Sequence, residues 1–232
     1  MSKKTVYFPH NLLLFAILLI VLLLVIGLLF VGVIGLAFRK VGFSAPVVAL
    51  ILVATFLGSY INIPLVKLKS TEPIIKEEYV NFFGILYKIP QVEYGETTTL
   101  LAVNVGGALI PTAVCIYLLC IATAQIITYS LLGVFIVAIV THVVARPVKG
   151  VGIETPVLIA PITAAIIAVI LSPGSPEIVA YVAGVLGALI GADLSNLNAI
   201  PKLGAPVASI GGAGTFDGVF LTGIIAVLLA AL

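Results

Sequence analysis

Long uncharged apolar runs alternate with short polar segments along almost the whole chain. The first of these runs, Asn11–Phe38, contains no charged residue. A membrane-spanning helix needs about 20 mostly apolar residues, and seven segments meet or approach that length. The predicted spans are Leu12–Ala37, Ser44–Ile63, Leu100–Leu119, Ala122–Val143, Thr155–Leu171, Ile178–Asp193 and Ser209–Leu232. The pattern therefore predicts an all-α integral membrane protein, with residues 1–232 forming a single transmembrane domain of about seven helices.

Two stretches leave the local structure open. Thr97–Thr141 has no charge and only a short break near Cys120, and its beginning contains threonines, glycines and Pro111. The start of the third span is therefore either helical or extended and re-entrant. Lys67–Thr97 is the one substantial polar segment, and Tyr79–Val92 alternates partly and is rich in aromatic and β-branched residues. This segment is expected to form a small β-hairpin, or an aromatic-anchored loop, at the cytoplasmic interface.

Composition and charge support a membrane protein and exclude several other classes. Hydrophobic residues make up 62% of the chain and charged residues 9%, and mean hydropathy is +1.35. Soluble domains are about 25% charged, so lipid must be the solvent for much of this surface. A net charge of +2 without a basic patch excludes nucleic acid as a partner. The two cysteines and two histidines show no metal spacing, so neither a metal nor a cofactor is expected.

The distribution of lysine and arginine predicts the orientation in the membrane. A cytoplasmic N-terminus places nine of these residues on the inner side and two, Arg39 and Lys40, on the outer side. That distribution satisfies the positive-inside rule, and it predicts a multi-pass protein of the cell membrane. Lys3 and Lys4 precede the first run in the manner of a signal peptide. That run is longer than a cleavable apolar region of about 7–15 residues, so it is interpreted as a retained helix.

Two aspartates within the apolar segments are the strongest candidates for chemistry. Asp193 ends the sixth predicted span, and Asp217 follows a glycine-rich stretch that leads into the seventh. Charges inside a membrane are costly, which makes intramembrane carboxylates functional candidates. The predicted topology brings both to the cytoplasmic side. Their depths match only if Pro206–Gly214 is largely irregular, and irregular backbone at membrane depth must line protein or water.

Other polar and glycine residues are expected on the same side. Asn104 opens the third span, and His142 and Arg146 lie one helical turn apart at the end of the fourth. Arg146 is expected to neutralise one aspartate and Asn104 to hydrogen-bond the other. The candidate substrate-binding residues are Asn104, Gly106, Gly107, His142, Arg146, Gly211, Gly212, Gly214 and Thr215. Structural interpretations are also open: Asp217 caps a helix with Thr215, Asp193 is a snorkelling residue at a helix end, Arg146 and His142 are interfacial, and the glycines permit close helix packing.

Several of these stretches resemble an uncharacterised family of multi-pass membrane proteins of archaea and bacteria, classified as a domain of unknown function. The matching stretches are Asn104–Pro111, His142–Ile153, Gly191–Leu194 and Leu203–Gly223. The family implies no activity.

A second, more distant similarity suggests a reaction. Gly214–Leu229 is similar to the Gly-x-Gly-Asp helix of the presenilin and signal-peptide-peptidase proteases. That similarity implies a catalytic role for Asp217, paired with an aspartate on the preceding helix, here Asp193. The sequence departs from the protease pattern in having Phe216 in place of the second glycine and Ala192 in place of the usual aromatic. No Pro-Ala-Leu motif follows Asp217.

Three functions follow from these features. The first is an intramembrane aspartyl protease, in which Asp193 and Asp217 share a proton and cleave a membrane-embedded peptide. The alternative is a secondary transporter or channel with a broken-helix, glycine-lined site near Gly211–Gly214 that takes a small ion or anion. The third is a scaffold or lipid-binding protein with structural aspartates. Membrane lipid is a partner in every case, and the oligomeric state is left open.

Overall fold

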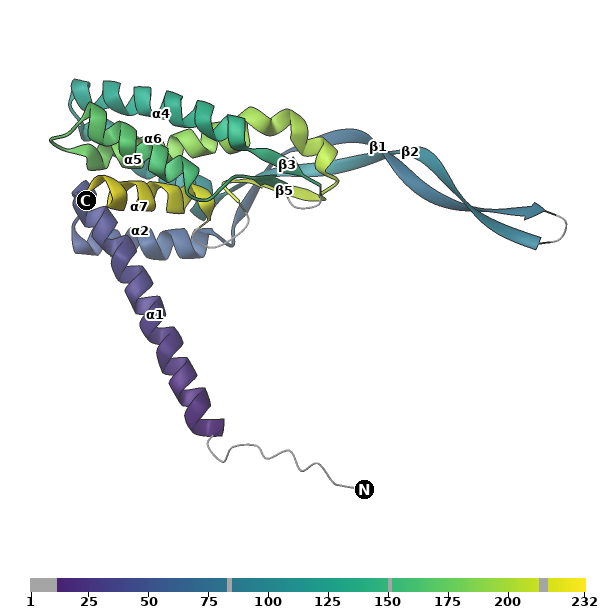
Figure 1. The fold of residues 1–232 in the computed structure, drawn as a ribbon, viewed down its shortest axis with the longest axis horizontal. Helices are drawn as coiled ribbons and strands as arrows, with labels where there is room; N and C mark the ends of the chain where they lie inside the picture. The colour runs from purple at the N-terminus through teal and green to yellow at the C-terminus, as the bar shows by residue number, and fades with distance from the viewer. Residues whose placement is uncertain (1–11, 83–84, 150–151, 213–216) are drawn as a thin grey trace.

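A computed structural model describes residues 12–82, 85–149, 152–212 and 217–232. The described chain is mostly helical and forms a bundle with strands at one end (Figure 1). Its α-helices are α1 Leu12–Val41, α2 Ala45–Gly58, α3 Ile110–Ile121, α4 Ala124–Val144, α5 Ile159–Leu171, α6 Pro176–Ala188 and α7 Gly218–Ala230. Its strands are β1 Asn62–Phe82, β2 Ile85–Asn104, β3 Arg146–Val148, β4 Gly152–Glu154 and β5 Val207–Ile210. Two π-helical segments, η1 Val105–Leu109 and η2 Leu189–Asp193, and a 3₁₀ helix, η3 Leu194–Leu203, complete the described elements.

Three of the described helical segments are long and apolar enough to cross a membrane. They are Phe15–Val41, Ala124–Val144 and Pro176–Pro201, the last of which joins α6, η2 and most of η3. The other apolar helices are shorter, and α5 and α7 have 13 residues each. At 1.5 Å per residue these two are about 20 Å long, less than the ~30 Å of a bilayer's hydrocarbon core.

Helix α1 packs against the bundle only near its C-terminal end. Ile34, Ala37 and Phe38 are buried there, and the Phe38 ring lies 5.6 Å from Tyr181 and 6.1 Å from Phe220 between centroids. Residues 15–33 are all exposed, and Figure 1 shows this part of the helix diverging from the bundle. A helix that is apolar all round without packed neighbours requires apolar surroundings, as a lipid bilayer provides.

Helix α6 is the centre of the bundle and packs against α4, α5 and α7. Its residues Val179–Val185 are all buried. Ala183, Gly187 and Gly191 recur every four residues and form the stripe that meets α4. A Cβ on Gly187 would lie 2.6 Å from the Cβ of Val137, so the two backbones approach more closely than a larger residue would permit. Small residues thus set the spacing of the central helix pair.

The strands differ most from the predicted helical pattern. β1 and β2 pair antiparallel from Asn62↔Asn104 to Phe82↔Ile85, and together form a ribbon that projects from the bundle (Figure 1). β5 adds to β2 in parallel, through Leu100↔Val207 to Val103↔Ile210. The predicted third span therefore begins as a strand, and helical structure starts only at Val105. A parallel pairing with residues about 100 positions away outweighed local hydrophobicity, and no local pattern reveals such a partner.

Two other predicted spans also change at their ends. Ser44–Ile63 was expected to be one helix, but α2 ends at Gly58 and β1 begins at Asn62. Ser209–Leu232 was expected to be the seventh helix, but β5 occupies its start and α7 begins at Gly218. The backbone around Pro206–Gly212 is extended and turned, which is the irregular form expected for this stretch.

Replacing Gly187 with alanine tests the packing of α6 on α4. We expect the added Cβ to collide with Val137 and to cost about 1–3 kcal/mol, which lowers the unfolding midpoint by about 5 °C. Maleimide labelling of Cys115 during heating reports unfolding, since this thiol is buried. The exposed Cys120 is first replaced by serine. Gly27→Ala, where a Cβ meets nothing within 4 Å, is the matched control. Equal midpoints for the two variants would contradict this packing.

Candidate functional site

Asp193 lies where the central helix loses its regular form. The α-helical hydrogen-bonding pattern of α6 ends at Ala188, and η2 carries the chain to Asp193 before η3 begins. Such π-helical turns occur frequently at functional sites. The Asp193 side chain is partly buried, and its Oδ2 accepts a hydrogen bond of 2.7 Å from the backbone N–H of Gly211. That bond connects the end of η2 to the turn after β5.

Asp217 is the N-cap residue of α7. Its backbone is extended, with φ −69° and ψ 176°, and its Oδ1 accepts a hydrogen bond of 2.6 Å from the N–H of Gly218. The positive end of the α7 dipole favours a negative charge at this place. The structural interpretation of Asp217 as a cap therefore describes one of its roles. Its other oxygen, Oδ2, lies against Gly212.

The turn Gly211–Gly212 holds the two aspartates at one site. Both glycines have φ of +80°, a conformation that other residues rarely adopt. Gly211 donates to Asp193, while the place that a Gly212 side chain would take is filled by the Asp217 carboxylate. The Gly212 N–H in turn donates to the Ser209 carbonyl at 3.2 Å. Asp193 and Asp217 thus both contact this turn.

Asn104 contacts the Gly211–Gly212 turn through Gly107 and does not bind an aspartate. The residue is fully buried and caps η1, its Oδ1 accepting from the Gly107 N–H at 2.7 Å. Its Nδ2 donates to the Ser59 carbonyl at 2.8 Å and to the Asn62 Oδ1 at 3.1 Å. The expected hydrogen bond from Asn104 to an aspartate is therefore wrong, since both ends of its amide are used elsewhere. Gly107 packs directly on the Gly211 carbonyl.

A cavity of about 420 Å³ opens beside the carboxylates, between the helix ends and the strands. Asp193 and Asp217 both line it, and Ser209, Thr155 and Thr222 are the hydroxyl-bearing residues in its wall. The remaining wall is mainly apolar side chains and backbone. It is contributed by residues of 152–160 around β4, by Ala188 and Ala192, by residues of 200–212 around β5, and by residues of 218–221 in α7. A largely apolar pocket with a few convergent polar groups is typical of a binding or active site.

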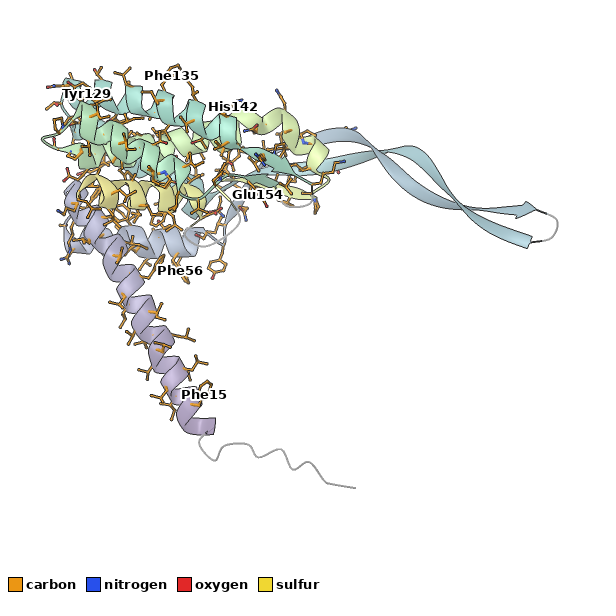
Figure 2. The ribbon with its side chains drawn as sticks, viewed as in Figure 1. Phe15, Phe56, Tyr129, Phe135, His142 and Glu154 are labelled. Atoms are coloured by element: carbon orange, nitrogen blue, oxygen red, sulfur yellow. The ribbon has the colours of Figure 1, made fainter. Side chains whose placement is uncertain are left out.

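Several residues expected at the site lie elsewhere. His142, in the last turn of α4, is exposed and does not line the cavity (Figure 2). Arg146 is exposed in β3, paired in register with Glu154, and does not line the cavity either. Gly106 packs against Thr55 and Ser59 of the α2 end, not against an aspartate. The prediction that His142 and Arg146 lie one helical turn apart is wrong, because α4 ends at Val144 and the chain is extended from there to Arg146.

Gly214 and Thr215 lie outside the described residues. Ser209 and Asn62 were not predicted from the sequence, although the Ser209 hydroxyl donates to the Asn62 Oδ1 at 2.7 Å. Asn62 follows the short polar break Ser59–Tyr60, which has the pattern of an ordinary turn between apolar runs. Either residue could have been predicted as part of the site only if the association of β1, β2 and β5 had been known.

The groups present define what the site can do chemically. Two carboxylates brought together at one site can share one proton and act as acid and base. They can also bind a proton or a sodium ion reversibly. Within the parts of the chain that the structure describes, no group of three or more His, Cys, Asp or Glu residues is arranged to hold a metal ion. Asp193 and Asp217 are thus the titratable side chains that line the cavity.

Comparison with known proteins identifies the family. Residues 56–229, about three quarters of the chain, match the family described as "Protein of unknown function (DUF1614)". This range contains both aspartates, η1 and every stretch that resembled an uncharacterised family. No curated protein and no solved structure matches the chain. The protein therefore belongs to the DUF1614 family.

Proposed function

We propose that this protein is an intramembrane aspartyl protease in which Asp193 and Asp217 form the catalytic pair. The observation that carries the proposal is that both carboxylates line one cavity, beside the glycine turn that connects them. The similarity of Gly214–Leu229 to the Gly-x-Gly-Asp helix of presenilin-type proteases supports the same assignment. Its substrate would be a membrane-embedded peptide.

The proposal places all seven apolar helices in the cell membrane, with the N-terminus in the cytoplasm. The asymmetry of lysine and arginine supports this orientation. α7 has only 13 residues, about 20 Å of helix. If Ala230 lies near the outer surface, Asp217 lies about 10 Å below the inner edge of a 30 Å hydrocarbon core. The carboxylates would then act inside the membrane depth, in a cavity that faces the cytoplasm.

The reaction needs one protonated and one ionised carboxyl group. The ionised group takes a proton from water as the water oxygen attacks the carbonyl carbon of the peptide. The protonated group gives its proton to the carbonyl oxygen, and a tetrahedral diol forms. Transfer of a proton to the amide nitrogen then lets the carbon–nitrogen bond break, which releases an amine and a carboxylic acid. Asp193 and Asp217 fill these two roles as a pair.

The edge of β5 offers a way to hold an extended substrate at the carboxylates. The Leu100 N–H donates to the Pro206 carbonyl, so Pro206, Ala208 and Ile210 turn their backbone groups toward β2. Val207 and Ser209 therefore turn theirs away from it. β5 is the last strand in the described order β1-β2-β5, and Val207–Ile210 line the cavity. A peptide that adds to this edge as a strand would lie beside both aspartates.

A transporter is the second candidate, and the broken backbone before α7 favours it. Gly211 and Gly212 turn the chain between β5 and α7, as in the interrupted helices of transporters. Asp217 already occupies the positive end of α7, so a proton or a cation suits this site better than an anion. Proton or sodium flux into protein-containing liposomes, lost in Asp193→Asn and without any peptide cleavage, would favour this function.

Asparagine at either aspartate tests the protease proposal. We expect Asp193→Asn and Asp217→Asn each to lower cleavage at least about 100-fold, because an amide neither accepts nor supplies the transferred proton. Liposomes that contain the purified protein and a set of single-span peptides are followed by mass spectrometry. Glu154→Gln changes an exposed carboxylate on β4 and serves as the control. Cleavage at the wild-type rate by either aspartate variant would rule out the catalytic pair.

Proline at position 209 tests the strand edge. Ser209→Pro removes the outward N–H of β5, and edge strands tolerate proline where the N–H does not join the sheet. We compare it with Ser209→Ala, because both variants lack the hydroxyl. Loss of one hydrogen bond to the substrate predicts a kcat/KM up to about tenfold lower for proline than for alanine. Equal kcat/KM values for the two would mean that peptides do not pair with this edge.

A further inference from the structure

A cluster of side-chain hydrogen bonds around the buried Asn104 joins the base of the ribbon to the carboxylates. Asn62 and Asn104 are the first paired residues of the ribbon, at the point where it leaves the bundle. The Asn62 Oδ1 accepts hydrogen bonds from Asn104 at 3.1 Å and from the Ser209 hydroxyl at 2.7 Å. The strands β1, β2 and β5 are thus fastened together by side chains as well as by their backbones. Neither of these asparagines lines the cavity.

Asn104 reaches the Gly211–Gly212 turn by two routes. The first runs through η1: the Asn104 Oδ1 holds the Gly107 N–H, and Gly107 packs on the Gly211 carbonyl. The second runs through Asn62 to Ser209 of β5, two residues before Gly211 in the chain. The Gly211 N–H is the donor to Asp193. Both routes therefore end at the hydrogen bond that orients one carboxylate.

The close packing along the first route leaves little freedom to move. A Cβ on Gly211 would lie 2.6 Å from the Ala108 Cβ and 2.8 Å from the Gly107 carbonyl carbon. A Cβ on Gly107 would overlap the Gly211 carbonyl oxygen. Interiors packed to this density transmit a displacement instead of absorbing it. A change in η1 must therefore shift the Gly211 amide relative to Asp193.

We infer that Asn104 is a positioning residue, which fixes the Asp193 carboxylate for reaction through Gly107 and Gly211 without touching the substrate. This positioning role deepens the proposed protease function, and its effect on catalysis rests on that function. The hydrogen-bond geometry it describes can be tested without any activity. It also gives the ribbon a physical connection to the site, since Asn104 is both the last residue of β2 and the cap of η1.

The test follows the Gly211 amide directly by nuclear magnetic resonance. The protein is labelled with ¹⁵N-glycine and ¹³C-isoleucine and studied in detergent, so that only amides of glycines that follow isoleucine are selected. The signal that responds to Asp193→Ala is then assigned to Gly211. A short bond to a carboxylate moves an amide proton downfield. Asn104→Ala is expected to move the Gly211 signal upfield over most of the shift that Asp193→Ala causes. Asn104→Ser, which can still cap η1, should retain most of the wild-type position.

Gly107→Ala provides a second variant that keeps Asn104 intact. Its added Cβ should displace Gly211 and move the same signal, and it should do so less than additively with Asn104→Ala. The signals of Gly35 in α1 and Gly191 in η2, which also follow isoleucine, report that the bundle remains folded. An unchanged Gly211 signal in folded Asn104→Ala, or in folded Gly107→Ala, would overturn the inference. So would a serine variant that shifts as far as alanine.

Cleavage kinetics separate this inference from the protease proposal. A displaced carboxylate should lower kcat of Asn104→Ala at least about tenfold and leave KM within about twofold, since misplacement acts on the transition state. Asn104→Ser should recover most of the lost kcat. If the Gly211 signal responds as expected but no peptide is cleaved by the wild type, the positional role stands and the protease proposal falls. If peptides are cleaved and kcat of Asn104→Ala is unchanged, the positioning role falls alone.

Discussion

Backbone amides that leave regular structure inside an apolar bundle must find a partner, and this constraint shapes the end of the bundle where the strands lie. Two of the places where the chain leaves its helical path there follow α6 and precede α7. At the first departure Asp193 accepts from the Gly211 N–H, and at the second Asp217 accepts from the Gly218 N–H. Asn104 does the same for Gly107 in η1. Polar side chains at these positions are thus required by the backbone before any chemistry is considered.

The structural role of the two aspartates is compatible with the proposed catalytic role. An ionised carboxylate has two oxygens and about four acceptor positions. Each aspartate gives one oxygen to a backbone amide, which fixes the orientation of its carboxyl plane. Both residues also line the cavity. Residues with locked orientation are what an active site requires, because a reactive group must be held close to its productive geometry.

Small residues allow the close approaches on which both the bundle and the site depend. Gly187 and Gly191 bring α6 against α4, and η2 then carries the chain from this contact to Asp193. Gly107 and Gly211 bring η1 against the turn after β5. The same property, absence of a Cβ, thus serves helix packing at one place and carboxylate placement at the other. Gly211 and Gly212 are explained in part by packing and in part by backbone conformation.

The sequence by itself determined the apolar helical character of the chain, most helix positions within a few residues, and the two aspartates as candidates, because these depend on local hydrophobicity and on the cost of burying charge. It also indicated that Thr97–Pro111 and Pro206–Gly214 could depart from helix. Only the tertiary structure decided that β2 extends to Asn104 and pairs with β5, since that pairing joins residues about 100 positions apart. For the same reason, only the tertiary structure showed that His142 and Arg146 do not line the cavity. It also showed that hydrogen bonds to distant segments hold Asn104 next to Gly107, which packs on Gly211.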